Sequence, residues 1–199
     1  MTTAAAAVTH TPAEEWKQPS RSLVGMACLI IAESAIFIIF VVAYLFYTGK
    51  SLSGPQPKDV LELPIFSSIC LLSSSITVHF AVHALQHSKL KATVAWLAGT
   101  VLLGSIFLGC TAQEWYKLIY HDGLTIRTNL FGTTFYSLVG LHASHVVAGL
   151  IMLGLALIFG LFGKLHQHHA ERLEVVSIYW HFVDAVWVVV FTVVYVLGR

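Results

Sequence analysis

Long apolar runs, separated by short polar connections, dominate the chain. A helix that crosses a bilayer needs about 20 consecutive, mostly apolar residues, and five segments meet this requirement. Barrel strands would be about 10 residues long with strict alternation, and these runs show neither feature. The pattern therefore predicts an all-α integral membrane protein, an up-and-down bundle of five transmembrane helices. The predicted spans are residues 23–47, 64–86, 93–118, 130–162 and 173–197.

The connections between the spans are too short to hold an extramembrane domain. We therefore expect a single membrane domain over residues 23–199, preceded by an N-terminal cytoplasmic tail over residues 1–22. Glu14 and Glu15 precede the first apolar run without a basic leader, which is not the pattern of a secretory signal. The fourth span is longer than a perpendicular crossing requires, so we expect it to tilt or to project into water.

Composition agrees with the membrane prediction. Charged residues make up 11% of the chain and hydrophobic residues 57%, whereas a soluble domain carries roughly 25% charged residues. The formal net charge of +1 gives no broad basic surface, which argues against a nucleic-acid partner. Lysines and arginines are divided almost equally between the two sides, with a slight excess that favours a cytoplasmic N-terminus and an outer C-terminus.

Acidic and imidazole side chains lie inside the apolar runs, where an ionised group costs roughly 2.5–3.5 kcal/mol on insertion scales. Glu33 is near the middle of the first span. Two interpretations stay open for it: a proton site or lipid-contacting acid, and a neutral acid hydrogen-bonded to another helix. The other candidate residues are Glu114, His142, His145, Glu174, His181 and Asp184, with His79 and His83 as weaker candidates.

Histidines on several helices are compatible either with a metal site or with helix packing. A membrane cytochrome would use histidines from separate helices as axial ligands. A di-iron carboxylate site would use Glu-x-x-His motifs on two helices, and the chain contains none. Histidines at steps of four on one helix, as at His79 and His83, are more typical of a helix contact. An independent haem or metal redox protein stays open as the remote alternative.

Other classes of chemistry find less support. The chain has no nucleophile elbow and no phosphate-binding loop. A small transporter using Glu33 and Asp184 lacks the repeat symmetry of many transporters. The serines at positions 73–75 and the glycines at 149, 154, 160 and 163 indicate close helix contacts. The three cysteines form no ligand motif, and the histidines at 166, 168 and 169 are expected in a solvated loop.

Four stretches carry a resemblance to a known family. They read ESAIFIIFVVAY, LELPIFSSICLLSSSIT, GTTFYSLVGLHASHVVAGL and YWHFVDAVWVVVFTVVY, and the acid in AQEWY accompanies them. These stretches are distributed over nearly the whole range from Gly25 to Gly198. The chain resembles subunit III of the haem–copper respiratory oxidases, which include cytochrome c oxidases and quinol oxidases. The full form has seven helices, and the N-terminal pair has no counterpart here, so what replaces it is an open question.

The resemblance implies an accessory subunit of a proton-pumping terminal oxidase that passes electrons from cytochrome c to oxygen. Such a subunit holds no catalytic centre, no metal and no cofactor of its own, since haems and copper belong to subunits I and II. Direct packing on subunit I is implied, with subunit II and small subunits as further partners and phospholipid as a bound ligand. The implied location is a bacterial-type cell inner membrane, and the quinol-oxidase version is the alternative.

Residue by residue, Glu33 matches the family's buried acid, which lies near bound lipid in relatives. His142 and His145 match the GLHxxH pair, although Ser144 replaces a residue that is usually apolar. Glu114 matches the acid that ends the third span, and His83 corresponds only loosely. Glu174, His181 and Asp184 match the acid and the WHFVD motif of the last helix. We interpret His181 and Asp184 as a mutual polar contact that fixes helix packing.

Overall fold

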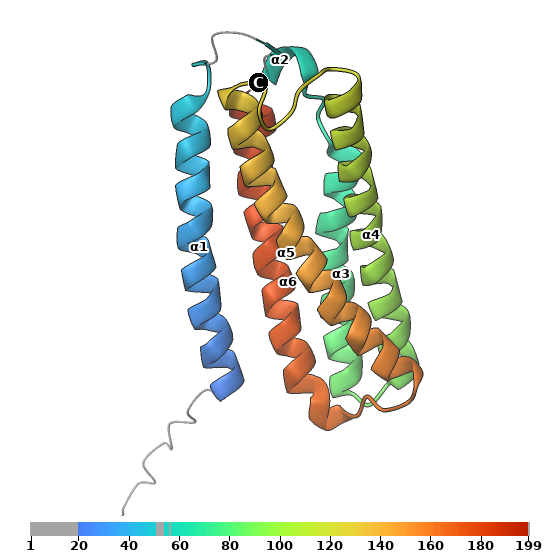
Figure 1. The fold of residues 1–199 in the computed structure, drawn as a ribbon. Helices are drawn as coiled ribbons and strands as arrows, with labels where there is room; N and C mark the ends of the chain where they lie inside the picture. The colour runs from blue at the N-terminus through green and yellow to red at the C-terminus, as the bar shows by residue number, and fades with distance from the viewer. Residues whose placement is uncertain (1–19, 51–53, 56, 199) are drawn as a thin grey trace, which may run out of the picture.

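The computed structural model describes residues 20–50, 54–55 and 57–198, and within them it confirms an all-helical bundle (Figure 1). Five of its helices are long and apolar enough to cross a membrane. The order of elements is α1 (Arg21–Tyr47), α2 (Pro57–Val60), α3 (Ile65–Gln86), α4 (Leu90–Tyr120), α5 (Leu130–Leu161), η1 (Gln167–His169), α6 (Ala170–Phe191) and η2 (Thr192–Leu197).

The predicted spans agree with the helices to within a few residues at most ends. The structure adds two features that apolar patterning did not predict. A four-residue helix, α2, occupies part of the first long connection. The last span ends in η2, a π-helix. Most of the predicted N-terminal tail, residues 1–19, lies outside the described residues.

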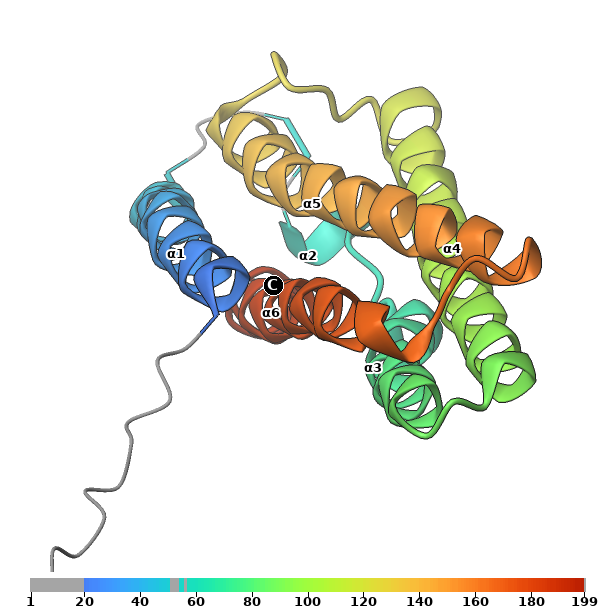
Figure 2. The ribbon, with the colours of Figure 1, turned by 90° about the horizontal axis from the view of Figure 1, so that it is seen from below.

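The long helices run alternately up and down, which gives the bundle two distinct ends (Figure 1). We call one the histidine end, because it carries His87, His166 and His168 in the connections that follow α3 and α5. The other, the α2 end, carries α2 and the loop that follows α4. Viewed along the bundle, α1 lies at the edge beside α5 and α6, and the two longest helices, α4 and α5, are inclined (Figure 2).

Helix ends follow from local sequence. Asn129 caps α5 by accepting a hydrogen bond from the Gly132 N–H at 2.8 Å, and Ser20 caps α1 in the same way. Gly163 adopts φ +69° after α5, a conformation that glycine reaches without steric cost. The chain there can turn back towards α6.

The core is organised around Trp180 on α6, whose side chain is fully buried. Its ring lies where side chains would otherwise project from two neighbouring helices: a Cβ added at Gly149 would come within 2.6 Å of the indole, and one at Gly104 within 3.0 Å. The indole N–H donates to the Ser74 hydroxyl on α3 at 2.9 Å. One side chain of α6 thus ties together α3, α4 and α5.

A second tryptophan, about two helical turns further along α6, makes a similar hydrogen bond to α3. The Trp187 indole N–H donates to the Ser68 hydroxyl at 3.0 Å, and Ser68 donates in turn to the Pro64 carbonyl. Serines in α3 therefore accept from tryptophans as well as allowing close approach. Of the four glycines expected at helix contacts, Gly149 and Gly160 meet a neighbouring helix, whereas Gly154 has nothing nearby and Gly163 serves the turn.

Adding one methyl group at Gly149 should destabilise the bundle. In Gly149→Ala the new Cβ would collide with the Trp180 ring, and overpacking of this kind typically costs about 1–3 kcal/mol. We expect a lower thermal midpoint for the purified chain in detergent, measured by the loss of monodisperse protein on heating. Gly154→Ala, on the same helix with open space around it, is the matched control and should leave the midpoint unchanged. Equal midpoints for the two variants would contradict this packing.

Candidate functional site: polar contacts inside the bundle

Glu33 and His145 form a polar contact between α1 and α5. Glu33 Oε2 lies 3.2 Å from His145 Nε2, and the two side chains are 25% and 14% exposed. His145 Nδ1 lies 2.8 Å from the Leu141 carbonyl, which can only accept, so Nδ1 carries a hydrogen. The contact with Glu33 then requires one further proton, held either on Nε2 or on the carboxyl group. This pair can therefore hold a proton inside the bundle.

His181 and Asp184 do not contact each other directly, which differs from the expected mutual contact. The Ser75 hydroxyl of α3 donates to Asp184 Oδ2 and lies 2.9 Å from His181 Nδ1. A hydroxyl has one hydrogen, so Ser75 accepts from the His181 N–H. His181 Nε2 lies 3.3 Å from the Ser177 hydroxyl. The WHFVD motif is thus joined to α3 through a serine.

The two histidines of LHASH have different environments. His145 faces α1, whereas His142 is 1% exposed and faces the core. The His142 ring stacks on Trp187 with centroids 5.0 Å apart and meets Phe107 edge-on. In the described part of the chain, neither His142 nitrogen has a hydrogen-bond partner. His142 is therefore placed as part of the aromatic core.

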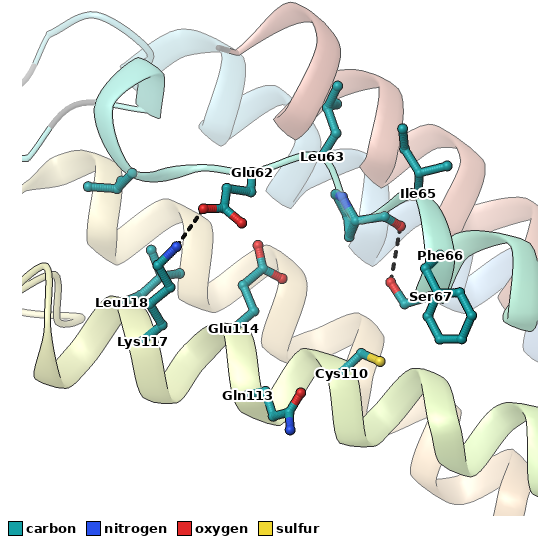
Figure 3. Close-up of a pocket in the computed structure, with 12 residues that line it drawn as sticks. Glu62, Leu63, Ile65, Phe66, Ser67, Cys110, Gln113, Glu114, Lys117 and Leu118 are labelled. Carbon is teal, nitrogen blue, oxygen red and sulfur yellow. Dashed lines mark hydrogen bonds and ion pairs between the residues drawn. The ribbon is translucent and has the colours of Figure 1, made fainter.

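Glu114 lies in a cavity of about 300 Å³ at the α2 end, between α4 and the segment that leads into α3 (Figure 3). The Tyr195 hydroxyl contacts both carboxylate oxygens, at 3.0 and 3.1 Å. Tyr195 reaches Glu114 from the π-helix η2, an element that often occurs at functional sites. Lys117 in the same cavity contacts the Glu62 carboxylate at 2.5 Å. The cavity thus combines an acid held by a tyrosine with a separate ion pair.

The two weaker candidates, His79 and His83, face outwards, and so does Glu174. His79, His83 and Glu174 are exposed in the isolated chain, and the structure gives their side chains no hydrogen bond to the other described residues. The ring centroids of His83 and His87 lie 4.3 Å apart at the histidine end. The structure therefore keeps His83 and Glu174 apart from the buried polar contacts. His79 is close enough to His181 for the two imidazoles to interact electrostatically.

No group of three or more histidine, cysteine, aspartate or glutamate residues is placed to hold a metal ion within residues 20–50, 54–55 and 57–198. The candidate histidines are distributed among different contacts. Sequence reasoning missed three hydroxyl groups that make these contacts: Ser75, Ser177 and Tyr195. A hydroxyl inside an apolar span was the available signal, but its partner depends on helix rotation.

Comparison with known proteins gives consistent relatives. The family model described as "Cytochrome c oxidase subunit III" matches residues 17–199. The cytochrome c oxidase subunit 3 of Bacillus sp. (strain PS3) is 34% identical over 87% of this chain and 84% of the relative. The probable quinol oxidase subunit 3 of Staphylococcus saprophyticus is 31% identical over 87% of this chain and 88% of the relative.

The match covers all five membrane-length helices and every polar contact described above. Relatives named for either electron donor resemble the chain to a similar degree. The resemblance inferred from the sequence motifs is therefore confirmed: the chain belongs to the cytochrome c oxidase subunit III family, whose members are subunits of haem–copper oxidases.

Proposed function

We propose that this chain is the accessory, non-catalytic subunit III of a proton-pumping haem–copper terminal oxidase that passes electrons from cytochrome c to oxygen. The family match over residues 17–199 is the observation that carries the proposal. The contacts of two candidate histidines are consistent with it, because His145 meets Glu33 of α1 and His181 meets Ser75 of α3. In this proposal haems and copper are held by subunits I and II.

A quinol oxidase is the second candidate, and the similarity to a relative named as a probable quinol oxidase subunit 3 favours keeping it. The donor is chosen by other subunits, so this chain fits either complex. Steady-state oxidation of reduced cytochrome c, compared with oxidation of a soluble quinol by the purified complex, distinguishes the two. Exclusive use of quinol would contradict the assignment to a cytochrome c oxidase and favour a quinol oxidase.

In the proposed assembly the chain packs directly on subunit I, with subunit II and small subunits nearby. The proposed location is a bacterial-type inner membrane, with the N-terminus cytoplasmic and the C-terminus outside. The histidine end then faces the cytoplasm. An epitope placed at the N-terminus should be accessible to antibody in inside-out vesicles only. Access in right-side-out vesicles would reverse this orientation.

Glu33 is proposed to support proton uptake by the complex. Its carboxyl group lies 3.2 Å from the His145 imidazole between α1 and α5, at a site that is only partly covered by this chain. Glutamine at this position keeps the size of the side chain and a hydrogen-bonding group but cannot release a proton. The proposal therefore predicts that the Glu33→Gln complex keeps the subunit but completes fewer turnovers before it loses activity.

The function is tested by comparing three complexes: with this chain, without it, and with Glu33→Gln. We expect all three to show the same initial rate of oxygen reduction, because the redox centres lie elsewhere. The complex without the chain should lose activity after fewer turnovers, and Glu33→Gln should be intermediate while retaining the subunit. A complex without initial activity in the absence of the chain would contradict the accessory role. Dissociation of the Glu33→Gln chain would show that the acid is structural.

Phospholipid binding is also proposed, at a groove of about 470 Å³ between the end of α5 and the start of α6. Met152, Leu155, Phe159 and other apolar side chains form its walls. Its rim carries Lys164, His169 and Arg172, and no carboxylate of the described residues lines it. Among the described residues, neither Lys164 nor Arg172 takes part in an ion pair. Basic groups above an apolar groove at the membrane edge suit an anionic phospholipid.

The lipid site is tested by removing the two rim cations. The double variant Lys164→Gln/Arg172→Gln should purify with less anionic phospholipid. The lipid headgroup loses both cationic side chains that would bind it, while the apolar walls of the groove are unchanged. The control variant Lys89→Gln/Lys91→Gln removes the same charge at the same end, outside the groove. Native mass spectrometry of the complex measures the bound lipid. Equal lipid content in the two variants would rule out this groove as the site.

A further inference from the structure

Three histidines follow one another along the outward face of α3. His79, His83 and His87 are spaced by four residues and all are exposed in the isolated chain. Closer to the α2 end, the same face carries exposed apolar residues, among them Ile69 and Ile76. The outward face of α3 therefore changes from apolar to polar within the length of one helix.

This change begins inside the bilayer. The 22 residues of α3 span about 33 Å, close to the ~30 Å thickness of a hydrocarbon core. His79 lies seven residues before Gln86, or about 10 Å from the histidine end. Ionisable residues at such depth almost always face a bundle interior or a water-filled cavity. An imidazole directed at acyl chains would have no hydrogen-bond partner there.

Polar groups of α6 extend the same surface. The contacts of Ser68 with Trp187 and of Ser74 with Trp180 fix the antiparallel register of α3 and α6. This register brings His83 level with the first turns of α6, where Glu174 is exposed. His181, seven residues after Glu174, shares its helix face and is partly exposed beside Ser75.

We call these residues the α3–α6 polar strip: His79 and His83 on α3, His87 directly after its end, and Glu174 and His181 on α6. The strip residues are exposed or partly exposed, and in Figure 2 no other described helix lies against α3 and α6 on the side away from α5. By contrast, exposed positions on α5, such as Ile151 and Leu155, form an apolar face typical of lipid contact. The strip is thus the part of the outer surface that suits a protein neighbour better than lipid.

We infer that the α3–α6 polar strip is the surface on which the haem-carrying subunit docks. The partner element is a membrane-spanning helix that offers hydrogen-bonding side chains in the half of the bilayer nearest the histidine end. Such groups would satisfy the imidazoles of His79 and His83, which make no hydrogen bond to the other described residues. The inference rests on the proposed function, since it names the contact surface of the proposed subunit.

The docking surface is tested in the whole complex with a photoreactive phenylalanine analogue, benzoyl-phenylalanine. It replaces Ile76, which is 60% exposed beside the strip, or Ile151, which is 58% exposed on α5. After illumination, the Ile76 variant should give a covalent product with the haem-carrying subunit that the Ile151 variant does not give. A product from Ile151 alone, or only lipid adducts from Ile76, would overturn the inference.

A second measurement uses the opposite effects of lipid and protein on an apolar substitution. If the strip contacts a partner, His79→Leu weakens retention of the chain when the complex is washed with detergent. If the strip faces lipid, the same change removes a polar group from hydrocarbon, and retention is unchanged or improved, which would overturn the inference. Absence of any haem-containing partner in the purified material would instead contradict the proposed function itself.

Discussion

The arrangement of this bundle depends on how the indole of Trp180 is accommodated. Between helices in lipid, association relies on close packing and hydrogen bonds, because acyl chains are as apolar as the side chains they would replace. Gly149 and Gly104 leave the space that the ring fills, and Ser74 accepts its N–H. The position of α6 relative to α3, α4 and α5 follows from these contacts.

Once α6 is held in this register, its other polar residues have defined neighbours. Trp187 meets Ser68, and Asp184 and His181 both meet Ser75. The serines of α3 thus form a row of acceptors and donors along α6. The rotation of α3 that directs Ser74 and Ser75 towards α6 leaves His79 and His83 on its outer surface. Internal packing and the polar outer strip are therefore two results of one helix orientation.

The fold was predictable because spanning a bilayer imposes simple requirements of length and polarity. The runs around Glu33 and LHASH were long enough to identify their helices without any knowledge of contacts. The polar partners were harder to predict. His142 and His145 stand three residues apart, yet one packs in the core and the other meets Glu33. Which neighbour a side chain meets depends on helix rotation, and nearly uniform apolar helices give little pattern from which to infer it.

The same limit explains why Ser75 was missed as the bridge between His181 and Asp184. Three consecutive serines offered a hydroxyl in every direction, and only packing selects the one that faces α6. The π-helix at Tyr195 could also not be predicted from the apolar periodicity, because a uniformly apolar segment is compatible with both α- and π-helical geometry. The family motif identified His181 and Asp184 as important without showing what each side chain contacts.

The central claim is that His142, His145 and His181 serve helix packing and proton holding in a subunit whose redox centres lie in neighbouring chains. The most direct measurement is the absorption spectrum of this chain purified alone, beside that of the complex from the same membranes. The account predicts a Soret band in the complex and none in the isolated, folded chain. A Soret band retained by the isolated chain would contradict it and would favour an independent haem protein.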